Sequence, residues 1–278
     1  MTRNFAALLA TAAGWVGRTT IPRQQTTAAA APPGQPSTAD ALRRLREGNA
    51  RFVNDTPTVE HRGASRRAQI AHGQHPFAVV LGCSDSRVPP EIVFDQGLGD
   101  LFVIRIAGEV APPEVIGSIE YAVEHLGCRT VIVLGHERCG MVEAALNASA
   151  DHAAHGHAAG SHLGGLIRKI LPGIEQVDRE SPDALDAAVF ANARAVARRI
   201  VAHSKLLAEM SHTGDVQITP ARYDLDTGVV EFMQPVGGAD EGAAGPESEA
   251  GNPKSASNSN DETAKPEAPS FGAPGFLH

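Results

Sequence analysis

Residues 77–87 read FAVVLGCSDSR, an apolar run that stops at Gly82 and is followed at once by a cysteine, an aspartate and an arginine. The run is rich in valine and leucine and is too short for a typical helix, so it predicts a β-strand. Because consecutive side chains in the run are apolar, we expect both faces of this strand to be buried, as in a parallel sheet. A cluster of reactive side chains would then begin where the strand ends.

Two other stretches repeat this pattern, and helical segments lie between them. Residues 101–105 read LFVIR, and residues 130–140 read TVIVLGHERCG. Helices are predicted at residues 115–125 and 141–146. Alternating strands and helices predict an α/β domain of three layers with a mostly parallel central sheet.

A helical arm is predicted at the start of this domain. Ser37 is followed three residues later by Asp40, which resembles a capping box and opens a helix. Leu42, Leu45 and Phe52 then follow at helical spacing and form one apolar stripe. Such a stripe is expected to lie against another surface.

The end of the domain is predicted from composition and turn signals. One long alanine-rich helix is expected over residues 185–210, and strands are expected at residues 216–219 and 229–233. Between these two strands, the Asp-Thr-Gly of residues 226–228 indicates a turn.

Three regions of the chain differ in composition. Residues 1–37 lack acidic side chains and combine arginines with an apolar run, which suits a secretory signal or an organellar transit peptide. A disordered extension without an address is the alternative, so the protein is expected to be exported or organelle-targeted in the first case and cytoplasmic in the second. Residues 38–235 form the predicted domain. Residues 236–278 are rich in Gly, Pro, Ser and Asn and are predicted to be disordered.

Charge and cysteine content narrow the class of protein. The net charge is -8 and the sequence pI is about 5.8, which argues against nucleic acid or an anionic membrane surface as the main partner. No apolar run reaches the ~18 residues of a membrane-spanning helix, so no integral membrane segment is expected. Three cysteines are too few for a disulfide framework, and an odd number cannot all pair. Thiols that bind metal or act in catalysis fit better.

The two segments after the buried strands carry the chemistry. Cys83 follows one strand, and His136 and Cys139 follow another. Ligands collect outside the carboxyl ends of strands in open α/β sheets. Zinc prefers thiolate and imidazole ligands, and three protein ligands leave the fourth position open, as in a catalytic site. The sequence therefore predicts a catalytic zinc site.

These residues resemble the signature of the beta-class carbonic anhydrases, in which Cys-x-Asp-x-Arg precedes His-x-x-Cys-Gly. The two parts occupy residues 83–87 and 136–140. The resemblance covers roughly residues 38–234, and its further matches lie at residues 48–52, 74–76, 94–97, 118–122 and 223–228.

The resemblance implies a zinc enzyme that reversibly hydrates carbon dioxide to bicarbonate and a proton by attack of zinc-bound hydroxide. It implies that Asp85 accepts a hydrogen bond from this hydroxide, and that Arg87 keeps Asp85 ionised and oriented. In some members, the same aspartate becomes a fourth zinc ligand and closes the site.

The resemblance also implies a pocket and an assembly. Substrate-binding roles fall on Gln74, Phe102, Tyr121 and Gly140. Core packing is the alternative for Phe102 and Tyr121, and loop capping is the alternative for Gln74. A homodimer or higher homo-oligomer is expected, with the helix of residues 42–52 packed on the neighbour.

Some features depart from the family or favour other functions. Glu109 stands where the family often has Asn or His. Carbonyl sulfide and carbon disulfide hydrolases share the zinc ligands, so they are the nearest alternative, and a non-enzymatic zinc module is a more distant one. The zinc deaminase pattern is absent. A histidine-rich stretch is interpreted as a solvated loop and contains His152, His155, His157 and His162.

Overall fold

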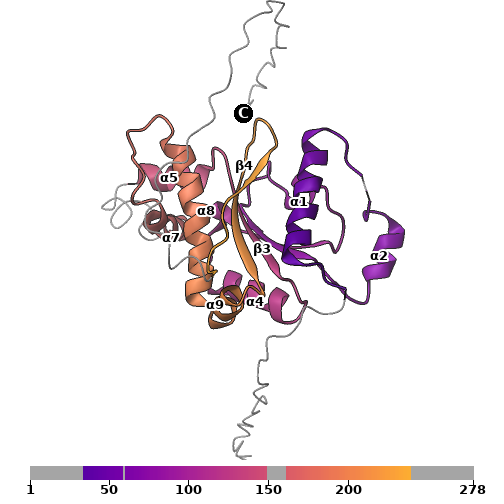
Figure 1. Ribbon diagram of the computed structural model, residues 1–278. Coiled ribbons are helices and arrows are strands. Elements are labelled where there is room, and N and C mark those ends of the chain that lie inside the picture. Colours follow the sequence, from indigo (N-terminus) through magenta and orange to yellow (C-terminus); the bar gives the residue numbers. More distant parts are fainter. Residues whose placement is uncertain (1–33, 59, 149–160, 239–278) are drawn as a thin grey trace, which may run out of the picture. The chain divides into compact units, whose positions relative to one another are not determined.

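The computed structural model describes residues 34–58, 60–148 and 161–238. These residues form an α/β domain around a five-stranded sheet of strand order β2-β1-β3-β4-β5 (Figure 1). The first four strands are parallel and β5 is antiparallel to β4. The predicted fold class is confirmed. The strands are β1 (Ala78–Gly82), β2 (Leu101–Arg105), β3 (Thr130–His136), β4 (Gln217–Tyr223) and β5 (Val230–Phe232).

Helices connect the strands and cover both faces of the sheet. Within the described residues the α-helices are α1 (Thr38–Val53), α2 (Ala64–Ile70), α3 (Pro90–Val93), α4 (Pro113–Glu124), α5 (Gly140–Asn147), α7 (His162–Ile170), α8 (Ala184–His203) and α9 (Lys205–His212). Two short 3₁₀ helices are η1 (Ala107–Glu109) and η2 (Leu171–Gly173). None of these helices combines the length and apolar character that a membrane span requires.

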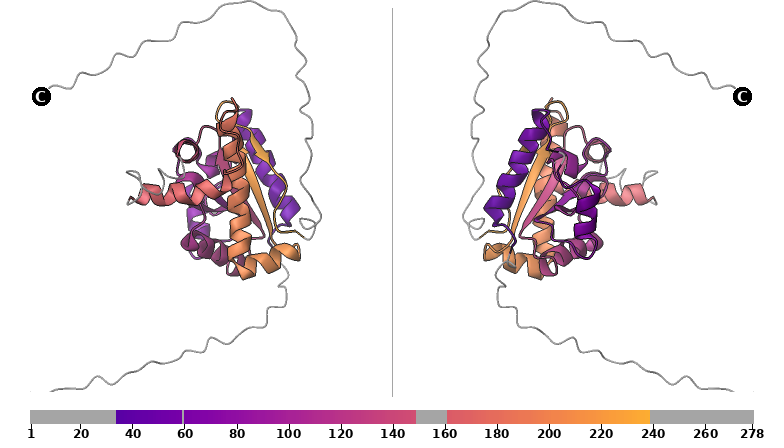
Figure 2. Two further views of the ribbon diagram at one scale, coloured as in Figure 1. Left: turned by 90° about the vertical axis from the view of Figure 1, so that its left-hand side faces the viewer. Right: turned by 90° about the vertical axis from the view of Figure 1, so that its right-hand side faces the viewer.

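The alternation of side chains along β1 explains the three layers. Val79 and Leu81 pack with α4 and α8 on one face, whereas Ala78 and Val80 pack with α1 and α3 on the other. Figure 2 shows α1 and α8 on opposite sides of the sheet. Since every residue of β1 and β3 is buried, the near-continuous apolar runs of the sequence are explained by two-sided covering.

Helix α1 begins as predicted, and part of its apolar stripe packs on the sheet of its own chain. The Ser37 hydroxyl accepts a hydrogen bond from the backbone N–H of Asp40 at 3.1 Å. Ala41 and Leu45 are fully buried against the sheet of their own chain, in the same cluster as Val80. The buried part of the apolar stripe of α1 is therefore covered by its own sheet. The packing of this helix on a neighbouring subunit stays a prediction.

The predicted helix over residues 185–210 is divided into α8 and α9. The backbone of Ser204 is extended, with φ -128° and ψ 112°. Its hydroxyl accepts a hydrogen bond from the N–H of Leu207 and donates one to the Glu120 carboxylate. The composition of the segment favours helix throughout, but this cap starts a new helix in a changed direction.

The described chain extends beyond residues 38–235 at both ends. Gln35 donates to the carbonyls of Pro76 and Leu126, and Val236 forms an isolated antiparallel bridge with Ile218. Most of the predicted extension and tail lie outside the described residues.

The histidine-rich stretch falls largely outside the described residues as well. His152, His155 and His157 lie there. His162, which was expected in a loop, is instead the first residue of α7, and Ser161 caps this helix by accepting from the N–H of Gly164.

Candidate metal centre and active site

The three predicted ligands meet at the carboxyl ends of two neighbouring parallel strands. Cys83 directly follows β1, His136 ends β3, and Cys139 caps the start of α5. All three residues are buried, and their ligand atoms lie within 4.8 Å of one another. The structure thus brings together the side chains that the sequence predicted as a zinc site.

The geometry and the donor set fit zinc. The two Sγ atoms are 4.0 Å apart, close to the separation of about 3.8 Å that two 2.3 Å bonds make at a tetrahedral ion. His136 Nε2 is buried and has no hydrogen-bond partner. Its Nδ1 lies 2.9 Å from the carbonyl oxygen of Glu137, which can only accept a hydrogen bond. The proton therefore resides on Nδ1, and Nε2 presents a lone pair to a metal.

The thiol pair is prepared for ionisation. The two thiols lie within hydrogen-bonding distance of each other, and this contact lowers the pKa of Cys83 to about 4 and raises that of Cys139. The backbone N–H of Gly108 also donates to Cys83 Sγ at 3.3 Å. Burial lowers the pKa of His136, but the charge of the nearby Cys83 and the carbonyl of Glu137 help to outweigh burial and raise it above its ordinary value. Negative charge is therefore concentrated on Cys83.

Asp85 and Arg87 form a close ion pair beside the ligands. Arg87 Nε and Nη2 donate to the Asp85 carboxylate at 2.9 and 2.7 Å, and the Arg87 backbone N–H donates at 2.9 Å. The Arg87 side chain in particular holds the pKa of Asp85 well below its usual range. Asp85 Oδ2 lies 3.8 Å from His136 Nε2. The aspartate is ionised, faces the ligand cluster and is paired with arginine.

Arg105 supports this loop and was missed by the sequence reasoning. Its Nε donates to the carbonyl of Cys83 at 3.0 Å, and its Nη2 donates to the carbonyl of Asp85. The available signal was an arginine that ends an apolar strand at the same edge of the sheet. Because the Cβ atoms of Cys83 and Asp85 follow their backbone, Arg105 helps to orient both side chains.

Glu109 lies buried behind the ligands. It has a backbone φ of +39°, and its side chain is wholly inaccessible to solvent. Asn192 of α8 donates to Glu109 Oε1 at 2.7 Å, while Oε2 has no hydrogen-bond partner. Burial, with a contribution from the charge of Cys83, raises the pKa of Glu109 from 4.5 to about 8. Asn192 is a second residue that the sequence reasoning missed, because it lies far away in the chain.

The raised pKa of Glu109 predicts a specific pH dependence of stability. Between about pH 4.5 and pH 8, the unfolded chain releases a proton that the folded chain keeps, so this group makes the zinc-free fold less stable as pH rises. The slope is roughly 1.4 kcal/mol per pH unit. The glutamine of Glu109→Gln does not titrate. The free energy of unfolding of this variant, relative to that of the unmodified protein, should therefore increase from about pH 5 to pH 8. Urea unfolding with a chelator present measures the difference, and a pH-independent difference would contradict the assignment.

Of the four predicted substrate-binding residues, Gly140 lies beside the ligands, where it opens α5 next to Cys139. The other three lie elsewhere. Gln74 lies in the exposed loop before β1. Phe102 pairs in register with Val79, so it lies about 10 Å along β2 from the end of the strand that faces the ligands.

Tyr121 lies beside Phe102. Its ring centroid lies 6.2 Å from that of Phe102, and the residue is 47% exposed on α4. The structure therefore does not bring Phe102, Tyr121 and Gln74 to the ligands of their own chain.

An α/β domain with two thiols and an imidazole at adjoining strand ends has the site of a metal-dependent enzyme. Comparisons with known proteins agree on one family. The family model described as carbonic anhydrase matches residues 78–230. Carbonic anhydrase 2 of Mycobacterium tuberculosis is 38% identical over 197 residues, which make up 71% of this chain and 93% of the relative.

Two solved structures share the fold. A Coccomyxa beta-carbonic anhydrase crystallised with acetazolamide has a TM-score of 0.55 at 23% identity, covering 72% of this chain and 90% of the other. One of two tetrameric beta-carbonic anhydrases from the ascomycete Sordaria macrospora has a TM-score of 0.51 at 21% identity, covering 60% and 84%. The chain belongs to the beta-class carbonic anhydrases, as its sequence predicted. It is therefore an enzyme of carbon dioxide hydration.

Proposed function

We propose that the chain catalyses this hydration as a zinc enzyme, with the ion bound by Cys83, His136 and Cys139. The buried Nε2 of His136 without a hydrogen-bond partner, between two thiols, is the observation that carries the proposal. When bound, zinc supplies a Lewis acid that lowers the pKa of a water molecule toward neutrality. A zinc ion bound by two ionised cysteines and one neutral histidine would also give each of these buried ligand atoms a partner.

The chain's own residues orient the reacting groups. An ionised carboxylate can only accept hydrogen bonds. Asp85 therefore selects an oxygen nucleophile that donates a hydrogen bond to it, and a lone pair of that oxygen then points away from Asp85. Arg87 fixes the plane of this carboxylate through two parallel contacts. Arg105 fixes the backbone from which Asp85 projects. Each contact reduces the reorganisation needed to reach the transition state.

Stopped-flow hydration of carbon dioxide, with zinc counted in the same sample, tests this function. About one zinc per chain and a rate that rises between about pH 6.5 and pH 9 would support it. Activity confined to the alkaline end would indicate that Asp85 closes the site below that pH. One zinc per chain without hydration at any pH would defeat it, and carbonyl sulfide and carbon disulfide would then be the substrates to test.

We infer a homodimer or a multiple of it from the free edge of the sheet at β2. Among the described strands, β2 is paired only with β1. Two β2 edges related by a two-fold axis pair antiparallel, which sets the amino half of one strand beside the carboxyl end of the other. Phe102 and Tyr121 of one chain would then approach the ligands of the other. This arrangement gives both residues the substrate-pocket role implied by the family resemblance.

Tyr121→Asp should break this assembly. The side chain is half exposed in the single chain, so the change should leave the fold intact, whereas a carboxylate in an apolar interface is costly. We expect a lower mass by light scattering and reduced hydration activity. Leu163→Asp is the matched control, because Leu163 is equally exposed but lies on α7. An unchanged mass for Tyr121→Asp would refute the β2 interface.

A further inference from the structure

The turn between two of the expected ligands has a strained backbone. Arg138 lies between His136 and Cys139, and its φ is +50°. A residue with a side chain rarely adopts this left-handed conformation, and it persists only where the surroundings hold it. The turn must therefore be fixed by contacts outside itself.

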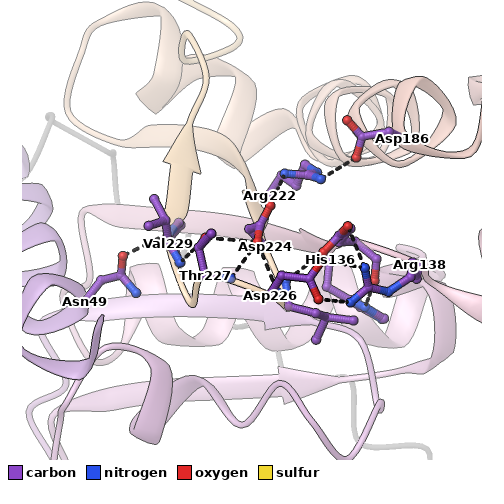
Figure 3. A network of polar contacts seen from close by, with 12 residues as sticks. Asn49, His136, Arg138, Asp186, Arg222, Asp224, Asp226, Thr227 and Val229 are labelled. Atoms are coloured by element: carbon purple, nitrogen blue, oxygen red, sulfur yellow. Dashed lines mark hydrogen bonds and ion pairs between the residues drawn. The ribbon is translucent and has the colours of Figure 1, made fainter. Parts of the chain in front are cut away.

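Those contacts come from the hairpin that joins β4 to β5. Arg138 Nη2 and Nη1 donate to the two oxygens of Asp226 at 2.6 and 2.9 Å, and Figure 3 shows the two side chains facing each other. Arg138 also donates to Glu137 Oε1 at 2.8 Å. The other oxygen of Glu137 accepts from the N–H of Leu225 at 3.0 Å. Two adjacent side chains of the turn thus bind one hairpin.

The hairpin is itself anchored, so it can serve as a fixed support. Asp224 Oδ1 accepts from the N–H groups of Asp226 and Thr227 and from the Thr227 hydroxyl. Asn49 of α1 donates to the carbonyl of Gly228 at 2.8 Å and accepts from the N–H of Val230 at 2.9 Å. Figure 3 shows Asn49 beside this hairpin and Asp224 within it.

Arg222 ties the same hairpin to α8. It forms ion pairs with both Asp224 and Asp186, the latter a residue of α8. The hairpin that carries Asp226 is therefore anchored to α1 on one face of the sheet and to α8 on the other.

The contacts continue to the metal ligand. The backbone N–H of Glu137 donates to the carbonyl of Tyr223 at 2.8 Å, and the carbonyl of Glu137 accepts the hydrogen of His136 Nδ1. The Glu137 backbone therefore fixes the tautomer and the ring orientation of His136. A shift of this backbone would move the imidazole, and release of Arg138 would move Cys139 as well.

We propose that Glu137, Arg138 and Asp226 form a clamp that positions the His136–Cys139 turn and slows the loss of the metal. The inference rests on the proposed zinc function and assigns three positioning residues to it. In the structure both Glu137 and Arg138 contact the hairpin, and of these two only Arg138 is half exposed.

Zinc retention and fold stability separate this role from a general structural one. An exposed ion pair such as Arg138–Asp226 contributes little to global stability. Removing an outer partner of a metal ligand, in contrast, typically lowers metal affinity about 10- to 100-fold. The clamp therefore predicts a large effect on zinc retention and a small effect on the melting temperature of the zinc-free protein.

The experiment measures zinc transfer from the loaded protein to a chromogenic chelator, together with thermal melting of the zinc-free protein. Asp226→Asn and Glu137→Ala should release zinc roughly 10-fold faster, with little change in zinc-free melting. Asp226→Glu keeps the charge and should restore most of the retention. Glu47→Gln removes an exposed arginine–carboxylate pair on α1 and should match the unmodified protein.

A double-mutant cycle tests whether the pair acts as a unit. If it does, Arg138→Gln combined with Asp226→Asn should release zinc no faster than the faster single variant. If Asp226→Asn and Glu137→Ala both release zinc at the rate of Glu47→Gln, the clamp is overturned and the proposed zinc function is not. Equal losses of zinc retention and of zinc-free melting would also overturn it, in favour of a structural role. An unmodified protein that binds no zinc would overturn the proposed function and the clamp together.

Discussion

Cys83→Ser is expected to leave the chain folded but without zinc and without carbon dioxide hydration. The substitution removes one of three soft ligands and replaces it with a hydroxyl that is not ionised at neutral pH. Loss of an outer partner alone costs about 10- to 100-fold in metal affinity, so loss of a direct ligand should exceed about 100-fold. His136→Ala should have the same effect, because Nε2 is the only nitrogen in the ligand cluster.

Cys128→Ser is the matched control for this prediction. Cys128 is as buried as Cys83, but its thiol donates to the carbonyl of Pro76 at the opposite end of β1, a contact that a serine hydroxyl can make. Burial raises the pKa of Cys128 to about 12, so it remains a thiol. Elemental analysis of zinc per chain should show about one ion in the control and almost none in Cys83→Ser. Full zinc content in Cys83→Ser would remove Cys83 from the metal site.

Much of the fold and of the metal site was predictable because it depends on local signals. Apolar runs that end at Gly82 and Gly135 mark two strands, and parallel strands bring their carboxyl ends to one edge. The ligands follow those ends directly, so strand position alone predicts their proximity. The capping box at Ser37 is equally local, and the structure confirms it.

The rest depends on contacts between residues that are distant in the chain. Nothing near Glu109 in the sequence indicates that Asn192, on a helix 83 residues away, donates to it. Arg138 and Asp226 are separated by 88 residues, so the clamp appears only once β3 and β4 are paired. The contact of α1 with its own sheet also joins distant residues, because an apolar stripe does not specify which surface covers it. Helix propensity likewise could not show that Ser204 would begin a new helix.

Asp85→Ala is expected to keep its zinc and lose most of its activity. The Asp85 carboxylate lies outside the group of three ligand atoms and is paired with Arg87, so metal content should stay near one per chain. Its proposed role is to accept a hydrogen bond from the oxygen nucleophile. Removing such an oriented polar group typically costs about 100-fold or more in rate. Asp85→Asn should be similarly impaired, since an amide can donate where only an acceptor is wanted.

The companion variant Arg87→Gln distinguishes charge from orientation. Without Arg87, the pKa of Asp85 should rise toward its ordinary value of 3.8, which still leaves the carboxylate ionised at neutral pH. Any loss of rate near pH 7 must therefore come from a carboxylate that is no longer held in place, and acid pH should add a further loss in this variant.

Ser86→Ala, an exposed change within the same loop, serves as the control and should retain full activity. Stopped-flow rates and zinc content measured on one sample decide the matter. A zinc-loaded Asp85→Ala enzyme at full rate would show that the carboxylate takes no part in the reaction. The pair with Arg87 would then be a structural contact that only orders the loop after β1.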